Sequence, residues 1–244
     1  MMTILIFFIL HWYLSLFVQT IFLHRYASHK MFTMSPFMEK VFFVLTALAQ
    51  GTSFLRPSLY GVMHNKHHEH SDTEKDPHSP VMSTNYFSFM NKTLYNYQAC
   101  EKLLEKKPNM LKNYPSWPIF EKIFDNYTVR FMFLGLYIWF YFLFAPSYIY
   151  FLLIPIHALM GPIHGFIVNW FGHKHGYRNF DSDDNSKNTL PVDVLMSGEL
   201  YQNNHHKYPK RANFAVKFYE FDLGFWILWI LNLFGVIKLN RETK

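Results

Sequence analysis

The sequence of 244 residues contains a single cysteine, Cys100. One thiol cannot form an intrachain disulfide, and it cannot supply the thiolate cluster of a zinc or iron–sulfur site. Charged side chains are also scarce, at 16% of the residues, and the net charge of +6 is not concentrated in a basic stripe. The sequence therefore predicts no nucleic-acid partner, because scattered Lys and Arg beside apolar segments are typical of the flanks of membrane spans. Any metal must be bound by nitrogen and oxygen.

Apolar residues make up 50% of the chain and aromatic residues 20%, a composition that indicates contact with lipid. Residues 3–23 are apolar apart from His11, Ser15, Gln19 and Thr20. A run of this length crosses a hydrocarbon core of about 30 Å. No basic segment precedes it and no small-residue cleavage site follows it, so it predicts a transmembrane helix and not a signal peptide. His11 and Gln19 are expected to hydrogen-bond to each other or to a neighbouring helix.

Two later apolar runs, residues 131–145 and 148–170, predict a transmembrane hairpin. Pro155 and the GPIHG sequence after it should kink the second of these spans and let a neighbouring helix approach closely. His157 and His164 lie seven residues apart on one face of that span. Hydrogen bonds between helices explain these two histidines better than a metal or substrate role, which is the alternative.

The charges beside the spans predict how the chain is oriented. Arg25 and Lys30 follow the first span and nothing basic precedes it, so the positive-inside rule places the amino terminus outside. Short apolar runs at 41–49 and 223–237 are expected to lie in the membrane interface. The expected fold class is an all-α, multi-pass integral membrane protein with about three transmembrane helices, interfacial helices and a cytoplasmic helical cap. The expected extents are a single domain of residues 1–244 and a cap of residues 24–130 and 171–244.

The heptapeptide HNKHHEH at 64–70 contains four imidazoles. Three of them, His64, His67 and His68, are spaced i, i+3 and i+4, which places them on one face of a helix. Neutral imidazole is a good ligand for iron, copper, zinc and nickel and a poor core-filling group, so this face predicts a metal site. A solvated His-rich loop is the alternative. His70 is expected to lie on the surface.

Further candidates lie at the same expected face of the membrane. His24 and His29 are five residues apart and would point about 140° apart on an unbroken α-helix, so the helix must end or bend if both are ligands. The others repeat the i, i+3 or i+4 spacing: Asn169 and His173, then Gln202, His205 and His206. One metal takes about three or four protein ligands, so this many imidazoles predict two metals. Zinc fits the same ligands, but a dinuclear histidine site beside lipid favours the oxidising chemistry of iron.

The integral-membrane fatty acid desaturases carry histidine boxes that resemble HRYASH, HNKHH and QNNHH, together with NWFGH before GYR. The similarity is greatest to the acyl-CoA type, which includes stearoyl-CoA desaturase, and it extends to DPH at 76–78, GE at 198–199 and HHxxP at 205–209. This resemblance implies that eight histidines bind two iron ions: His24, His29, His64, His67, His68, His173, His205 and His206. It also implies that Asn169 binds one iron through a water molecule.

One position departs from that pattern. The third box of the acyl-CoA type begins with His, and here the residue is Gln202, as in family members of the front-end type. Its amide oxygen could ligate as a weaker donor than imidazole, so its role stays open. Asp76 and Glu199 are the preferred carboxylates for orienting metal-bound imidazoles, ahead of Glu69 and Asp72, because their local motifs match. His78 either supports the site or lies on the surface, and His175 is expected on the surface.

The resemblance implies an O2-dependent fatty acyl desaturase, an oxidoreductase that removes two hydrogens from adjacent methylenes of a lipid acyl chain. The acyl group could be carried by coenzyme A, by acyl carrier protein or by a membrane lipid. The chain contains no cytochrome b5, flavin or ferredoxin motif. The two electrons are therefore expected from an external donor such as cytochrome b5 or ferredoxin, acting at a metal site on the cytoplasmic face.

Two other functions are compatible with these residues. A fatty acyl or lipid hydroxylase, or a related di-iron oxygenase, would use the same boxes. A non-catalytic membrane metal-binding or transport protein would instead require ionisable residues along the spans, whereas most histidines here cluster at the expected cytoplasmic ends.

Overall fold

The computed structural model describes residues 1–240 and is mainly helical. In these residues one two-stranded antiparallel sheet occurs, with Phe32 opposite Leu239 and Thr33 opposite Lys238. Residues 241–244, the end of the expected cap segment, lie outside the described residues.

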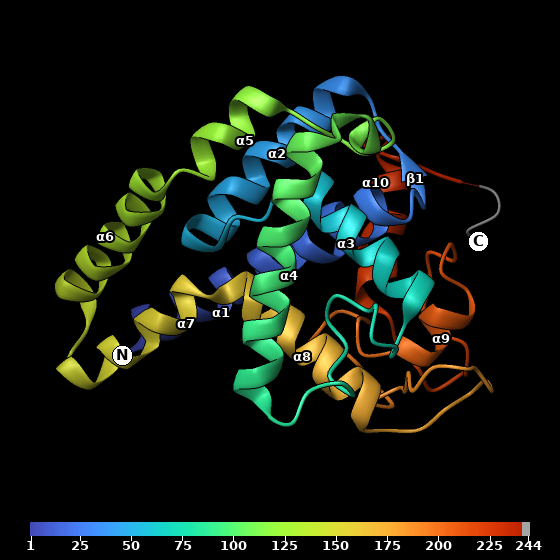
Figure 1. The fold of residues 1–244 in the computed structure, drawn as a ribbon. Coiled ribbons are helices and arrows are strands. Elements are labelled where there is room, and N and C mark those ends of the chain that lie inside the picture. Colours follow the sequence, from blue (N-terminus) through green and yellow to red (C-terminus); the bar gives the residue numbers. More distant parts are fainter. Residues whose placement is uncertain (241–244) are drawn as a thin grey trace.

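The elements follow one another as a series of helices with two short strands in the described part of the chain. The first half contains α1 (Met2–Phe17), the π-helix η1 (Val18–Ser28), β1 (Phe32–Thr33), α2 (Pro36–Gln50), η2 (Gly51–Ser53), α3 (Pro57–His70), α4 (Tyr86–Lys106) and η3 (Pro108–Leu111). The second half contains α5 (Pro118–Phe124), α6 (Tyr127–Phe144), η4 (Tyr148–Leu153), α7 (Ile154–Ala158), α8 (Met160–Lys174), α9 (Gln202–Lys207), α10 (Leu223–Leu233) and β2 (Lys238–Leu239). Figure 1 shows α1, α6 and α7 gathered at one end of the molecule and α9 at the other.

Length and apolar composition identify the membrane-spanning part. Two described helices can cross a membrane, the continuous helix Met2–Ser28 and α6. A third span is present if the bent pair Tyr148–Ala158 and Met160–Lys174 crosses as one. The membrane fold expected from the sequence is therefore confirmed. The first span, however, continues to Ser28 and does not end at residue 23.

The third apolar segment is bent by 70° between α7 and α8. Pro155 lies at the start of α7, and Pro162 lies in the first turn of α8. Proline has no N–H and fits a helix best in its first turn, so each proline begins a new helix and does not extend the preceding one. The predicted kink is confirmed, and the segment expected to end at residue 170 continues to Lys174.

A chain of hydrogen bonds joins four helices inside the apolar region. The carbonyl of Ala49 can only accept, so His11 donates to it from Nε2, at 2.9 Å. His11 Nδ1 then accepts from Nδ1 of His157 at 2.6 Å, and Nε2 of His157 accepts from the Tyr141 hydroxyl at 2.8 Å. The expectation of hydrogen bonds between helices is confirmed for His11 and His157. His164 is different, because both of its ring nitrogens lack a partner in residues 1–240.

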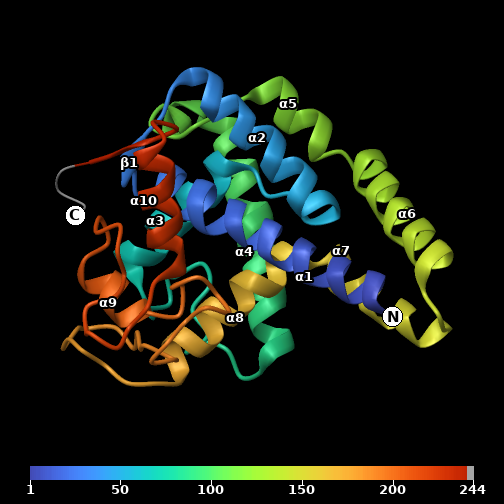
Figure 2. The same ribbon diagram turned by 180° about the vertical axis from the view of Figure 1, so that it is seen from behind.

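The C-terminal helix α10 is fixed against the end of the first span. Arg25 and Asp222 are both fully buried, and the guanidinium Nη2 donates to both carboxylate oxygens at 3.0 Å. Gly224 makes this approach possible, since a Cβ there would lie 2.1 Å from Nη1 of Arg25. Figure 2 shows α10 beside the inner end of the first span. With 11 residues α10 is short for a crossing helix, and its interfacial position stays a prediction.

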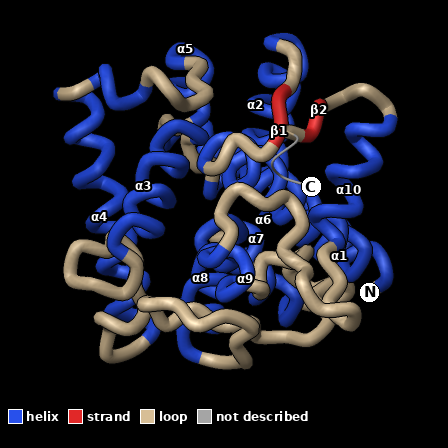
Figure 3. Tube along the Cα trace, turned by 90° about the vertical axis from the view of Figure 1, so that its right-hand side faces the viewer, coloured by secondary structure: helices blue, strands red, loops and turns tan. Residues whose placement is uncertain are grey.

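The segment between α8 and α10 is mostly loop and surrounds α9, as the tan tube in Figure 3 shows. Asn204 anchors it: its Nδ2 donates to the Phe214 carbonyl at 2.8 Å and to Glu220 at 2.9 Å. Asn188 in turn donates to Oδ1 of Asn204 at 2.9 Å. These bonds satisfy buried polar groups and fix the position of the histidines that follow Asn204 in α9.

Candidate metal centre

Four separate segments bring the eight expected histidines together in the interior. The end of η1, helix α3, the end of α8 and helix α9 converge at the end of the molecule opposite α6 (Figure 1). The histidines form two groups, and within each group the ligand nitrogens lie within 4.8 Å of one another. The larger group contains His24, His29, His64, His68 and His205, and the smaller one contains His67, His173 and His206.

The winding of η1 explains how His24 and His29 reach the same group. A π-helix pairs each N–H with the carbonyl five residues earlier, and His29 donates to the His24 carbonyl at 3.2 Å. Residues five apart therefore lie nearly one above the other, and the two imidazole centroids are 5.0 Å apart. The sequence required an end or a bend here, and the structure has a change of helix type followed by an end at Ser28.

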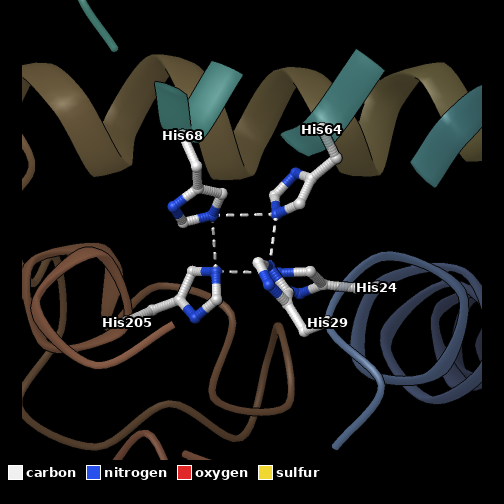
Figure 4. Close-up of side chains that lie close together, drawn as sticks. All are labelled: His24, His29, His64, His68 and His205. Carbon is white, nitrogen blue, oxygen red and sulfur yellow. Dashed lines mark hydrogen bonds between the residues drawn. The ribbon is translucent and has the colours of Figure 1, made fainter. Parts of the chain in front are cut away.

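In the five-imidazole group the Nε2 atoms point inward, as Figure 4 shows. Nε2 of His64 lies 2.8 Å from that of His29 and 3.0 Å from that of His68. Nε2 of His205 lies 2.9 Å from those of both His24 and His68. So many converging lone pairs repel one another unless protons or a cation lie among them. The donor set therefore fits a metal that accepts imidazole nitrogen.

The three-imidazole group shows the arrangement expected of metal-bound histidine even more directly. The Nδ1 atoms of His67, His173 and His206 each contact a carboxylate, and their Nε2 atoms have no hydrogen-bond partner in the described chain. An imidazole that donates Nδ1–H to a carboxylate keeps its Nε2 lone pair free and correctly oriented for a metal. The donor chemistry of this group also fits a metal.

The orienting carboxylates were only partly anticipated. Asp76 contacts His67 at 2.8 Å and Glu199 contacts His24 at 2.5 Å, and these are the two carboxylates preferred from the sequence. Asp72, a weaker candidate, contacts His173 at 2.9 Å. Asp184 contacts His206 at 2.5 Å, and sequence reasoning missed it, because nothing in its polar loop links it to a histidine 22 residues later. Glu69, the other weaker candidate, is largely exposed and lies 3.9 Å from the surface residue His70.

Gln202 and Asn169 line one small cavity with His24 and His64. Its volume of about 20 Å³ has room for a water molecule. The amide NH2 of Gln202 donates to the Glu199 carbonyl at 2.7 Å, and that of Asn169 donates to a carbonyl one helical turn earlier at 2.8 Å. Each amide oxygen is therefore the atom left to interact with a metal or its water.

Comparison with known proteins agrees with this geometry. Residues 1–230 match the family model described as fatty acid desaturase. The chain belongs to the fatty acid desaturase family. Membership in that family makes it an oxidoreductase, an acyl desaturase associated with membranes.

Relatives of this desaturase come from bacteria and plants. It is 30% identical to a hex-5-enoyl-[acyl-carrier protein] acetylenase of Moorena producens, over 93% of this chain and 73% of the relative. It is also 30% identical to an sn-1 stearoyl-lipid 9-desaturase of Synechocystis, over 90% of this chain and 67% of the relative. An acyl-CoA 5-desaturase of Anemone leveillei is 24% identical, over 94% of this chain and 70% of the relative.

The electrostatics of the desaturase favour neutral imidazoles beside ionised carboxylates. Burial lowers the pKa of His67 and His68 well below the ordinary value, and neighbouring imidazoles lower it further. Burial alone would raise the pKa of Asp72 and Asp184, but their hydrogen bonds with His173 and His206 hold it well below its usual range. Neutral imidazole and ionised carboxylate are the forms in which these groups bind a cation.

The three other histidines near the site, His70, His78 and His175, differ in their exposure to solvent. His70 is half-exposed and His175 is exposed, which confirms their expected surface positions. His78 is buried, its ring centroid lies 4.5 Å from that of His67, and its Nε2 has no partner in residues 1–240. His78 is therefore buried beside His67 and does not lie on the surface, and a supporting role at the site stays a prediction.

Proposed function

We propose that this desaturase is an O2-dependent di-iron enzyme that introduces a C=C bond into a lipid acyl chain. The observation that supports this most strongly is the convergence of eight imidazoles in two groups at the ends of apolar helices. Two irons held by these groups would supply the oxidising power to break unactivated C–H bonds, which no side chain has. The eight histidines would be the ligands, with Asn169 acting through a water molecule and Gln202 as a further oxygen donor.

The carboxylates are proposed to keep the imidazoles in the correct tautomer. Asp76, Asp72 and Asp184 accept the Nδ1 protons of the three-imidazole group, and Glu199 accepts that of His24. Each ring then presents Nε2 without having to reorient when a metal binds. Burial of the groups keeps bulk water away from the reacting carbons.

The acyl chain is proposed to pass between the first span and α8. Leu16 of α1 and Val168 of α8 form the apolar part of the wall of the small cavity beside His24 and His64. Removal of two hydrogens with reduction of O2 to two waters requires two electrons and two protons from outside the acyl chain. We propose an external donor such as cytochrome b5 or ferredoxin. The names of the relatives offer acyl carrier protein, membrane lipid and coenzyme A as acyl carriers.

We further propose a multi-pass topology with the site on the cytoplasmic face. Both groups lie at the ends of η1 and α8 that face away from the amino terminus. Arg25 and Lys30 at that end follow the positive-inside rule.

The function is tested by purifying the protein, measuring iron and profiling lipids in a host that provides a competent electron donor. Two irons per chain and new monounsaturated acyl chains are expected. His173→Ala should abolish formation of the double bond and lower the iron content. His175→Ala, two residues away and exposed, is the matched control and should change neither. Hydroxylated products would assign the chain to the oxygenases instead, and an iron-loaded protein that leaves the lipids unchanged would refute the proposal.

A further inference from the structure

Arg25 is a fully buried cation that is not itself a proposed metal ligand. It follows His24 in η1, and its exposed fraction is 0%. A buried guanidinium is costly unless opposite charges and hydrogen bonds compensate for the lost water. Its Nη2 is paired with Asp222, the residue that caps α10, and its Nη1 lies 3.4 Å from Oε1 of Glu199. Arg25 therefore lies between the start of α10 and the carboxylate that contacts His24.

Glu199 differs from the three other carboxylates that contact the imidazoles. Each of those three accepts at least one backbone N–H at 2.8–3.1 Å, so the main chain holds it in place: Asp72, Asp76 and Asp184. Within residues 1–240, the hydrogen-bond and ion-pair partners of the Glu199 carboxylate are side chains, those of Thr20, His24 and Arg25. Glutamate also has more rotamer freedom to lose than aspartate, so its orientation depends on these partners.

The π-helical winding of η1 brings Thr20 and Arg25 together. Residues five apart lie nearly one above the other in such a helix, and Nη1 of Arg25 donates to the Thr20 hydroxyl oxygen. That hydroxyl in turn donates to Oε1 of Glu199. Arg25 thus holds Oε1 both directly, as an ion pair, and through Thr20. The second oxygen, Oε2, then accepts the Nδ1 proton of His24.

The surroundings of Arg25 fix the guanidinium on its other side. Asp222 accepts the backbone N–H of Phe214 at 2.8 Å and that of Phe225 at 2.9 Å, so the position of its carboxylate is set by the main chain. The Phe214 ring lies against the guanidinium, with 4.1 Å from Cζ to the ring centroid, a cation–π contact. Arg25 cannot turn away from Glu199 without losing contacts with Asp222 and Phe214.

We propose that Arg25 is a positioning residue for the five-imidazole group. It holds Glu199 so that His24 donates from Nδ1 and presents Nε2 to the metal. The three-imidazole group does not need such a cation, because the main chain holds its carboxylates. This inference rests on the proposed metal site. The alternative is that Arg25 only fixes α10 through Asp222 and has no effect on the metal.

The two roles can be separated by removing charges in pairs. Arg25→Met alone leaves Asp222 as an unpaired buried charge, which weakens the fold whatever Arg25 does for the metal. The variant Arg25→Met/Asp222→Asn removes both charges, and the new amide oxygen can still accept a backbone N–H. The matched control is Asp222→Asn, which breaks the same ion pair with α10 but keeps Arg25 beside Glu199.

Binding of Fe²⁺ is measured without O2 against a competing chelator, and unfolding of the metal-free proteins is followed in denaturant. The double variant should bind one iron about 10–100-fold more weakly than wild type and the other equally well, as expected when the partner of one metal-bound imidazole is lost. Asp222→Asn should bind both with wild-type affinity and be no more stable than the double variant. Arg25→Lys retains a cation and should lose less iron affinity than the double variant.

A double-mutant cycle tests whether Arg25 acts through Glu199. Glu199→Gln should weaken the same iron. Adding Arg25→Met/Asp222→Asn to it should weaken that iron no further, because the two changes interrupt one contact. Fully additive losses would contradict the proposed route from Arg25 to His24.

Two other results would overturn the inference. One is wild-type affinity for both irons in the double variant. The other is an Asp222→Asn control that loses as much iron affinity as the double variant, which would mean that metal binding follows the docking of α10. Desaturation is measured separately, so a wild-type protein that binds two irons and forms no double bond contradicts the proposed function, while the iron affinities of the variants still test the role of Arg25.

Discussion

Nδ1 of His206 lies 2.5 Å from Oδ2 of Asp184, a carboxylate in a loop 22 residues earlier in the chain. The contact turns the Nε2 atom of His206 toward His67 and His173, which complete the three-imidazole group. A loop residue without a recognisable motif therefore orients a proposed metal ligand.

Replacing the Asp184 carboxylate should weaken metal binding by the three-imidazole group and leave metal binding by the five-imidazole group unchanged. Asp184→Asn keeps the size of the side chain but removes the charge that stabilises the Nδ1 proton, and such changes weaken metal binding by about 10–100-fold. We expect iron content to fall from two toward one per chain, measured by metal analysis after dialysis against a weak chelator. Asp183→Asn, at the exposed neighbouring position, is the control. Equal iron in both variants would show that the contact is not needed for metal binding.

Gln202 is predicted to contribute its amide oxygen to the site. Gln202→Ala should weaken iron binding by at least the roughly tenfold that loss of a supporting partner costs. Gln202→His should retain or strengthen it, because imidazole is the better donor. Iron content and activity are measured for both variants. Wild-type values in the alanine variant would exclude Gln202 as a ligand.

The hydrogen-bond chain through His157 should stabilise the membrane fold. His157→Leu leaves His11 Nδ1 and the Tyr141 hydroxyl without their partner, and polar contacts of this kind between membrane helices are worth about 0.6–1.7 kcal/mol. We expect a correspondingly lower free energy of unfolding in detergent. His164 lies in α8, the other half of the same bent segment. His164→Leu should not lower the free energy of unfolding, because His164 has no hydrogen bond to lose within the described chain. The prediction is wrong if the two variants are equally stable.

His78 should make the metal-free protein less stable in acid. Burial, followed by the proximity of His67, lowers the pKa of His78 from 6.5 to about 3. Between these values the unfolded chain binds a proton that the folded chain does not, so the free energy of unfolding falls as the pH drops from 6.5 toward 3. The contribution is at most about 1.4 kcal/mol per pH unit.

Denaturant unfolding of chelator-treated wild type and His78→Gln at several pH values measures this contribution, because the other buried histidines are common to both proteins. The variant should have a shallower dependence on pH in that window. Parallel curves would mean that His78 is protonated in the folded protein as readily as in the unfolded one.

Local geometry explains how much of the site was predictable. The i, i+3, i+4 spacing of His64, His67 and His68 depends only on the helix that contains them, and α3 is that helix. The apolar runs likewise predict membrane spans by their length, and the prolines predict the bend near Leu159. These features follow from residues close together in the chain.

The division of the histidines into two groups did not follow from spacing. His64 and His68 enter the five-imidazole group, while His67, between them, enters the other. His205 and His206 are adjacent and also separate, because successive residues on a helix point about 100° apart. His205 meets histidines of η1 and α3, whereas His206 meets those of α3 and α8. Which helix lies there depends on packing between segments far apart in the sequence.

Composition, span length and the spacing of the histidines are local properties, so they predict a helical membrane protein with a histidine-rich site, and the resemblance of its histidine boxes implies the desaturase family. Only the tertiary structure decided that η1 is wound as a π-helix, so that His24 and His29 reach the same group. It alone placed Asp72 and Asp184 behind His173 and His206, and it left His164 unpaired beside the proposed acyl path. The physical reason is that hydrogen-bond partners between distant segments are chosen by how the helices pack, and chain spacing does not encode that directly.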